Sequence, residues 1–325
     1  MSRSRRPVML ALRALGLGDL LTAVPALRAL AEAFPEHRRV LAAPSRLAPL
    51  AALTGAVDVV LDARPLAPVA LGVAPDVAVN LHGRGPESHH VLLAPRPGRL
   101  LAFAHPQVAA SRHGPEWQAE EHEVTRWCRM LEAHGIPADP SRLDLPAPRV
   151  RPPAAAIGAT LLHPGAASAA RRWPVERWAA VARAERAADR AVVVTSGPGE
   201  RALGRAVARA AGLGPGAALE ELPLLHLAAA VAAAGRVVVR DTGIAHLATA
   251  LRTPSVVLFG PCAPRLWGPP PARAWHRALW AGQSGDPHGL VPDPGLLAIG
   301  VEHVLQALAA LEDVRTTGLA LQEAA

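Results

Sequence analysis

The chain of 325 residues contains no lysine and no tyrosine, so all 34 of its basic side chains are arginine. A phosphate-binding lysine is therefore excluded, and arginine would bind phosphate as a planar fork of donors, not as a compact charge. The arginines are scattered, without the basic stripe and interleaved aromatic residues of a nucleic-acid surface. The net charge of +7 instead favours an anionic small substrate, with room for attraction to an anionic membrane surface.

Cysteine and long apolar runs are also scarce. Cys128 and Cys262 are far apart, and neither has the spacing of a disulfide framework or a zinc site. No uncharged apolar run reaches the roughly 18 residues that a membrane-spanning helix needs. The basic start at residues 1–7 leads into an apolar stretch too short for a signal peptide. We expect a cytoplasmic protein without a metal centre. Association with the inner face of the membrane is the alternative localisation.

What the sequence does contain is an alternation of short apolar runs and helical periodicities, and this alternation occurs twice. The first series predicts strands at 7–15, 39–43, 57–61 and 76–81, and helices at 20–34, 45–54 and 116–133. The second series predicts strands at 156–162, 191–195, 236–240 and 255–259, with helices between them and a closing helix at 301–311. A proline-rich passage separates the two series. Alternating strands and helices indicate parallel sheets with right-handed crossovers.

A glycine turn, Gly16-Leu17-Gly18-Asp19, follows the first predicted strand and precedes a helix. Its two glycines let the backbone approach a ligand closely. Asp19 has two interpretations that stay open at this point, a general base or a cap of the following helix. The GxGxxG fingerprint is absent, which disfavours a dinucleotide site.

Two segments that follow strands of the second series carry chemistry suited to phosphate or ribose. Ser168 and Arg171 precede a helix, so a hydroxyl, a guanidinium and backbone N–H groups could hold a diphosphate. An exposed basic loop is the alternative. Glu200 follows the strand at 191–195, where its carboxylate could accept hydrogen bonds from a ribose or simply favour a helix start.

The segment Asp241-Thr242-Gly243 follows the apolar strand at 236–240, at the end where open α/β sheets bind ligands. Thr242 and the N–H of Gly243 could hold a phosphate at the helix start. His246, one turn further, would face the same region. In the alternative interpretation, Asp241 caps the helix and His246 lies in the core.

Together these segments resemble glycosyltransferase family 9, the ADP-heptose:lipopolysaccharide heptosyltransferases. The resemblance rests on the order and spacing of short motifs over most of the chain. In the first half they are Leu12 to Leu21 and Pro25-Ala26-Leu27. In the second half they are His163-Pro164-Gly165, Arg172-Trp173-Pro174, Asp241 to Ala248, Thr253-Pro254 and Phe259-Gly260-Pro261.

This resemblance implies a GT-B type α/β fold, with two Rossmann-like domains facing across a cleft. Domain 1–150 would take the acceptor and domain 151–325 the nucleotide sugar, with the last helix a candidate to pack back on the N-terminal lobe. The implied reaction is an inverting transfer of a sugar, first of all heptose from ADP-heptose, to a hydroxyl of a glycan or lipid-linked acceptor. No cofactor, essential divalent metal or nucleic-acid partner is implied.

The resemblance also assigns roles to individual residues. Asp19 becomes the general base, and Gly16 and Gly18 form the turn near the acceptor. The donor-binding residues are Ser168, Arg171, Glu200, Asp241, Thr242, Gly243 and His246. Arg171 stands where the family usually has a lysine, so the charge is kept while the geometry changes.

Two other functions stay compatible with the residues: a nucleotide-sugar epimerase or hydrolase on the same fold, and a non-catalytic nucleotide-sugar-binding protein. The acceptor is not identified by the sequence. A group of basic side chains in the first half could contact it or lie on the surface, and the sequence favours neither: His82, Arg84, His89, His90 and Arg112.

Overall fold

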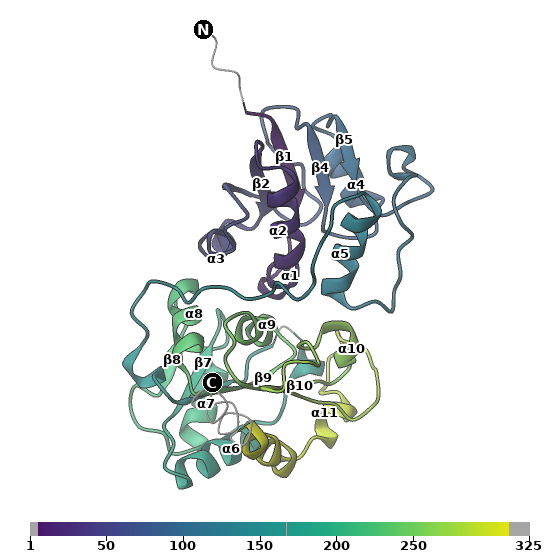
Figure 1. Cartoon of the computed structure of the whole chain (residues 1–325). Helices are drawn as coiled ribbons and strands as arrows, with labels where there is room; N and C mark the ends of the chain where they lie inside the picture. Colours follow the sequence, from purple (N-terminus) through teal and green to yellow (C-terminus); the bar gives the residue numbers. More distant parts are fainter. Residues whose placement is uncertain (1–5, 167, 312–325) are drawn as a thin grey trace, which may run out of the picture. The chain divides into compact units, whose positions relative to one another are not determined.

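The computed structural model describes residues 6–166 and 168–311. The chain divides into two compact units, Met1–Leu143 and Asp144–Ala325, and the division falls within the proline-rich passage. Each unit contains one parallel sheet with helices beside it (Figure 1). The predicted assignment of acceptor and donor to separate domains stays a prediction.

The N-terminal unit has a five-stranded parallel sheet in the order β3-β2-β1-β4-β5. The strands are β1 (Val8–Leu12), β2 (Arg38–Ala43), β3 (Val59–Asp62), β4 (Val77–Asn80) and β5 (Arg99–Leu101). The helices are α1 (Leu17–Thr22), α2 (Val24–Ala33), α3 (Ala48–Leu53), α4 (Glu87–Leu93) and α5 (Glu123–Ala133). The chain runs from β1 to one edge and returns on the other side of β1, so the strand order reverses between β1 and β4.

The C-terminal unit has a six-stranded parallel sheet in the order β11-β10-β9-β6-β7-β8. The strands are β6 (Thr160–His163), β7 (Val192–Ser196), β8 (Ala218–Glu220), β9 (Arg236–Arg240), β10 (Ser255–Leu258) and β11 (His276–Leu279). The helices are α6 (Val175–Ala187), α7 (Arg201–Ala210), α8 (Leu224–Ala233), α9 (Gly243–Ala250), α10 (Pro264–Trp267) and α11 (Pro294–Ala298). Here the strand order reverses between β6 and β9.

The central strands are continuous apolar runs because helices cover both faces of a parallel sheet. Strands β1, β4, β6, β9 and β10 are buried at every position. In the C-terminal core, Trp178 of α6 packs with Val207 of α7 and with Leu308. Residues 301–311 are helical and contribute Leu308 to this core. The predicted packing of the last helix on the N-terminal lobe stays a prediction.

Two predicted helices have other limits in the structure. The helix expected at 20–34 is two helices, α1 and α2, which meet at Ala23. Pro25 lies in the first turn of α2, where its missing N–H costs no hydrogen bond. The helix expected at 116–133 begins only at Glu123, after His122 accepts a hydrogen bond from the N–H of Val124.

Among the described residues, no helix is long and apolar enough to span a membrane.

Candidate functional site

The carboxyl ends of β6, β7, β9 and β10 bring the predicted donor residues of the C-terminal unit to one edge of its sheet. The strand order reverses between β6 and β9, and open α/β sheets bind ligands at such a reversal. Thr242 is the N-cap of α9, and helix residues begin at Gly243. Free N–H groups at a helix start favour an anion there.

Arg171 and Asp241 meet at this edge. The Arg171 Nη1 lies 3.5 Å from Asp241 Oδ2 and donates to the Asp241 carbonyl oxygen at 3.3 Å. Arg171 Nη2 also donates to the sulfur of Cys262 at 3.5 Å. The Arg171 side chain keeps 29% of its surface exposed, so it remains accessible to a ligand while it is paired.

Glu200 approaches the end of β6. Its Oε2 accepts a hydrogen bond from the N–H of Gly197 at 3.1 Å and lies 3.9 Å from Nε2 of His163. Burial and the nearby Arg240 charge lower the pKa of His163 to about 4, so this imidazole is neutral at pH 7. A Cβ at position 165 would overlap the Glu200 carboxylate, so the glycine leaves room for this carboxylate beside the end of β6.

Arg240, the last residue of β9, lies underneath these groups. It is 1% exposed, and its Nη2 donates to the carbonyl oxygen of Pro164 at 2.6 Å. Its Nε and Nη1 have no hydrogen-bond partner among the described residues. Burial lowers its pKa to about 9, Glu200 and Asp241 raise it, and Arg172 and Arg171 lower it further. Arg240 directly precedes the predicted Asp241-Thr242-Gly243 segment, and an arginine at the end of an apolar strand was the signal for it.

The other predicted donor residues divide into two groups. Among the described residues the Thr242 hydroxyl is buried without a hydrogen-bond partner, and Gly243 opens α9, so the start of this helix combines N–H groups with an unsatisfied hydroxyl. The Ser168 hydroxyl donates to the carbonyl oxygen of Pro287 at 2.7 Å, inside its own unit. His246 packs edge-on against the ring of Trp267, with centroids 5.9 Å apart.

In the N-terminal unit, Asp19 belongs to the first turn of α1 and has a 27% exposed side chain. Its Oδ2 accepts from the N–H of Gly16 at 3.0 Å, and its Oδ1 lies 3.4 Å from Nη2 of Arg13. Gly18 lies inside the same helix. The cap and the accessible carboxylate are thus combined in one side chain.

Behind Asp19 lies a buried charge cluster that the sequence analysis missed. Arg13 donates to Glu123 Oε1 at 2.8 Å and to the carbonyl oxygens of Asp19 and Leu81. Burial opposes ionisation of Glu123, but Arg13, Arg126 and the indole N–H of Trp127 together hold its pKa below the ordinary value. The i, i+4 spacing of Glu123 and Trp127 was the available signal, whereas contact with Arg13 joins residues 110 positions apart.

Of the side chains left open as acceptor contacts, His82 and His89 occupy defined places. Nδ1 of His82 accepts from the N–H of Ala14 at 3.2 Å, next to the glycine turn. The ring of His89 is fully buried, and burial followed by His105 and His90 lowers its pKa to about 4. His90 is exposed, and Arg112 donates to the ring of His113 at 2.9 Å.

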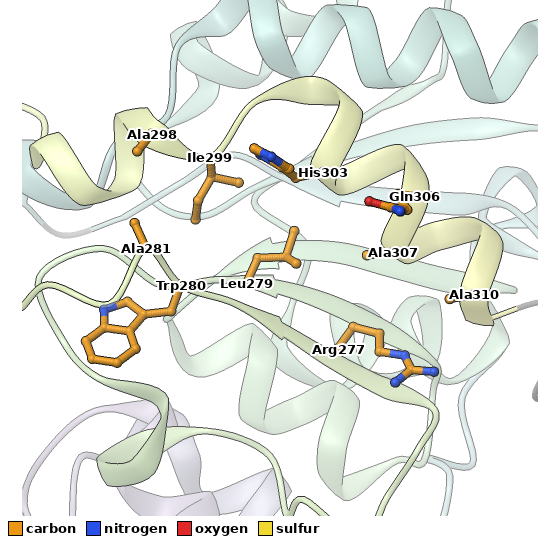
Figure 2. A pocket seen from close by; sticks show the side chains of 10 residues that line it. All are labelled: Arg277, Leu279, Trp280, Ala281, Ala298, Ile299, His303, Gln306, Ala307 and Ala310. Atoms are coloured by element: carbon orange, nitrogen blue, oxygen red, sulfur yellow. The ribbon is translucent and has the colours of Figure 1, made fainter.

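One cavity lies beside the glycine turn of the N-terminal unit, and another lies apart from the predicted site residues. A pocket of about 490 Å³ opens at the carboxyl edge of the N-terminal sheet and is lined by Gly16, Arg46, Asp62 and Arg64 among others. A second, of about 620 Å³, lies between β11 and the helix at 301–311 (Figure 2). Its lining includes none of the predicted site residues. Among the described residues, no group of three or more histidine, cysteine or acidic side chains could hold a metal ion.

A family model described as glycosyltransferase family 9 (heptosyltransferase) matches residues 105–285, more than half of the chain. The chain belongs to glycosyltransferase family 9. It is therefore a glycosyltransferase enzyme, as the motifs predicted. No curated protein matches the sequence significantly.

Solved structures of family 9 members share the fold. A family 9 glycosyltransferase from Veillonella parvula has a TM-score of 0.77 and 19% identity, over 95% of this chain and 98% of that one. The E. coli ADP-heptose lps heptosyltransferase II has a TM-score of 0.69 and 20% identity, over 98% and 100%. E. coli heptosyltransferase WaaC with ADP has a TM-score of 0.67 and 16% identity, over 93% and 98%. The predicted GT-B type fold of two Rossmann-like units is confirmed.

Proposed function

We propose that this family 9 enzyme transfers a sugar, with ADP-heptose as the first candidate donor, to a hydroxyl of a glycan or lipid-linked acceptor, with inversion at the anomeric carbon. The observation that carries the proposal is the edge of the C-terminal sheet, where Arg171, Asp241 and an unpartnered Thr242 hydroxyl gather at the start of α9. E. coli WaaC was solved with ADP, which supports a nucleoside diphosphate as the ligand class.

In this proposal the donor's diphosphate occupies the start of α9. Backbone N–H groups at Gly243 and the Thr242 hydroxyl donate to it, and the exposed part of Arg171 meets its charge. Glu200 accepts hydrogen bonds from the ribose. The Ser168 hydroxyl donates to Pro287 and the His246 ring packs against Trp267, so in this proposal both support the loop and α9. Their predicted contact with the donor stays a prediction.

The chemistry follows from the charges that develop. As the glycosidic bond breaks, negative charge grows on the leaving diphosphate, and the N–H groups with Arg171 stabilise it. The acceptor hydroxyl forms the new bond to the anomeric carbon, and Asp19 takes its proton. Arg13 holds Asp19 in place through the backbone and the carboxylate. With arginine meeting the leaving charge, we infer that transfer does not need a divalent metal and continues in a chelator.

Calorimetric titration tests the donor part of the proposal. We expect ADP or an ADP-sugar to bind, and Asp241→Ala to weaken this binding because Arg171 loses its partner. Asp58→Ala is the matched control, since Asp58 forms a surface ion pair with Arg39 in the other unit. Absence of binding by every nucleotide tested would overturn the donor site.

A product assay tests the transfer part. Wild-type enzyme incubated with ADP-heptose and acceptor glycans should form a glycoside with inverted configuration, and Asp19→Asn should reduce turnover by roughly 10²–10⁴-fold while ADP still binds. Consumption of the donor without any acceptor, unaffected by Asp19→Asn, would favour the epimerase or hydrolase alternative. For a lipid-linked acceptor we infer peripheral membrane contact, which sedimentation with anionic vesicles measures.

A further inference from the structure

Arg240 is a fully buried arginine of the C-terminal unit with few hydrogen-bond partners. It is buried to 1% exposure at the strand-order reversal, yet among the described residues only its Nη2 has a partner, the carbonyl oxygen of Pro164. Its Nε and Nη1 are buried without a hydrogen bond, and no carboxylate among the described residues forms an ion pair with it. A buried charge in this state is costly to the fold unless something else compensates it.

The neighbouring carboxylates are already engaged. Asp241 pairs with Arg171, and Glu200 accepts from Gly197 and faces His163. Three guanidinium groups, those of Arg171, Arg172 and Arg240, thus share two carboxylates, and His163 is neutral at pH 7. The charges of Glu200 and Asp241 act on Arg240 without forming an ion pair with it, Arg172 is exposed to solvent, and Arg240 is the fully buried guanidinium of the three.

The groups above Arg240 indicate what its buried charge is for. The Thr242 hydroxyl, two residues along the chain, is buried and unpartnered, and the free N–H groups of α9 follow directly. All of them are donors, so an anion completes this cluster and a neutral ligand does not.

We propose that Arg240 is a specificity-determining residue whose buried charge makes the site select ligands by the number of negative charges on their phosphate chain, so that a nucleoside diphosphate is preferred over a monophosphate. Because its nitrogens are buried, Arg240 acts on a bound anion through the electrostatic potential of its charge. It also holds the turn at Pro164 in place through its hydrogen bond to that carbonyl oxygen. The accessible contacts come from Arg171 and the N–H groups at the start of α9. This inference rests on the proposed donor site.

The test compares adenosine, AMP, ADP and inorganic pyrophosphate in calorimetric titrations of wild type and Arg240→Met. We expect the variant to bind ADP and pyrophosphate roughly tenfold to a hundredfold more weakly, the range for a lost charge-assisted interaction, with a smaller loss for AMP and none for adenosine. Equal affinity for ADP in both proteins, or an equal loss for all four ligands, would overturn the inference.

Arg236, at the other end of the same strand, offers a matched control. It is also buried, but its Nε lies 3.0 Å from Glu185 Oε2. Arg236→Met should lower the midpoint of thermal unfolding and leave the preference for ADP over adenosine intact. Arg240→Met, which removes an unpaired charge, should unfold at the wild-type temperature or above it in the absence of ligand. The reverse pattern would assign Arg240 a structural role only.

Arg240→Lys adds a readout that a structural role does not move. A buried lysine loses its proton more easily than arginine, so the preference for ADP should be lost at a lower pH in this variant than in wild type. A preference that is independent of pH in Arg240→Lys would contradict the inference. If wild type binds pyrophosphate more tightly than Arg240→Met does but binds no nucleotide, the proposed donor is overturned and the role of Arg240 stands. If wild type binds neither pyrophosphate nor a nucleotide, both proposals are overturned.

Discussion

Two buried arginines stand at comparable places in the two units, and they differ in how completely they are partnered. Arg13 follows β1, and Arg240 ends β9, each at the reversal of its sheet and each 1% exposed. Every nitrogen of Arg13 donates a hydrogen bond, and Glu123 neutralises its charge. Within the described part of the chain, Arg240 has one hydrogen bond and two nitrogens without a partner.

The difference separates two uses of the same side chain. A buried charge that the fold itself satisfies holds structure in place, here the glycine turn with Asp19, the loop at Leu81 and helix α5. A buried charge that the fold leaves unsatisfied, here that of Arg240, is a candidate for ligand binding. The first should therefore be felt in stability, and the second in ligand binding.

The largest expected effect is on folding, through Arg13. Arg13→Met leaves Glu123 buried without its main cation, so we expect a loss of roughly 3–5 kcal/mol in the free energy of unfolding, measured with denaturant. Glu123→Gln is measured alongside, because it tests the same pair if the first variant does not fold. Similar losses in Arg13→Met and Arg240→Met would erase the distinction between the two arginines.

A smaller effect is expected from Arg171, which the structure shows paired but accessible. Arg171→Met should weaken ADP binding by about tenfold, because a charge-assisted contact is lost. Arg171→Lys should recover most of this loss, since a lysine keeps the charge that the family usually carries at this position. Recovery would show that the charge matters here more than the fork geometry. Titration calorimetry of the three proteins decides between these outcomes.

The loss of stability at acidic pH tests the surroundings of Arg240 through its neighbour His163. Its folded pKa of about 4 lies below its ordinary value of 6.5, so between these pH values the unfolded chain binds more protons than the folded one. Stability should fall as the pH drops through this window, and His163→Gln should flatten part of that fall. His89 and His276, whose pKa values are also lowered, keep the rest in both proteins. Denaturant unfolding at pH 7, 6 and 5 measures the two slopes, and identical slopes would contradict the prediction.

The smallest effect concerns the two thiols. Cys262 is half-buried beside Arg171, and burial, followed by Asp241, raises its pKa, so alkylation should be slow at pH 7 and faster at higher pH. ADP should slow it further by covering the site. Cys128 is buried with its pKa raised to about 12 and should react only in denaturant. Mass spectrometry counts the modified thiols, and Cys262→Ser should remove the native reaction; modification that ADP does not slow would place Cys262 away from the ligand.

The sequence predicted the central strands well, but it did not predict the edge strands β8 and β11. The apolar run at β9 was placed at its observed limits because both of its faces are buried, which makes the run continuous. Strands β8 and β11 lie at the sheet edges, are only partly buried, and were missed. Their short, mixed sequences carry no periodicity that separates a strand from a loop.

The sequence predicted that Arg171, Glu200 and Asp241 lie at one edge of the C-terminal sheet. These residues follow strand ends, which parallel topology brings together. Their internal partners were not predictable. The contact between Arg171 and Asp241 joins positions 70 residues apart, and the hydrogen bond from Ser168 to Pro287 joins positions 119 apart. Whether Arg240 is partnered depends on every group packed around it, which no local pattern encodes.

Gly165 affects the edge of the C-terminal sheet although it has no side chain. The space that its side chain would fill is occupied by the Glu200 carboxylate. A single added methyl group, as in Gly165→Ala, would therefore force the Glu200 carboxylate to another position while leaving every charge of the site in the protein. The placement of one carboxylate at this edge thus depends on the absence of a side chain at position 165.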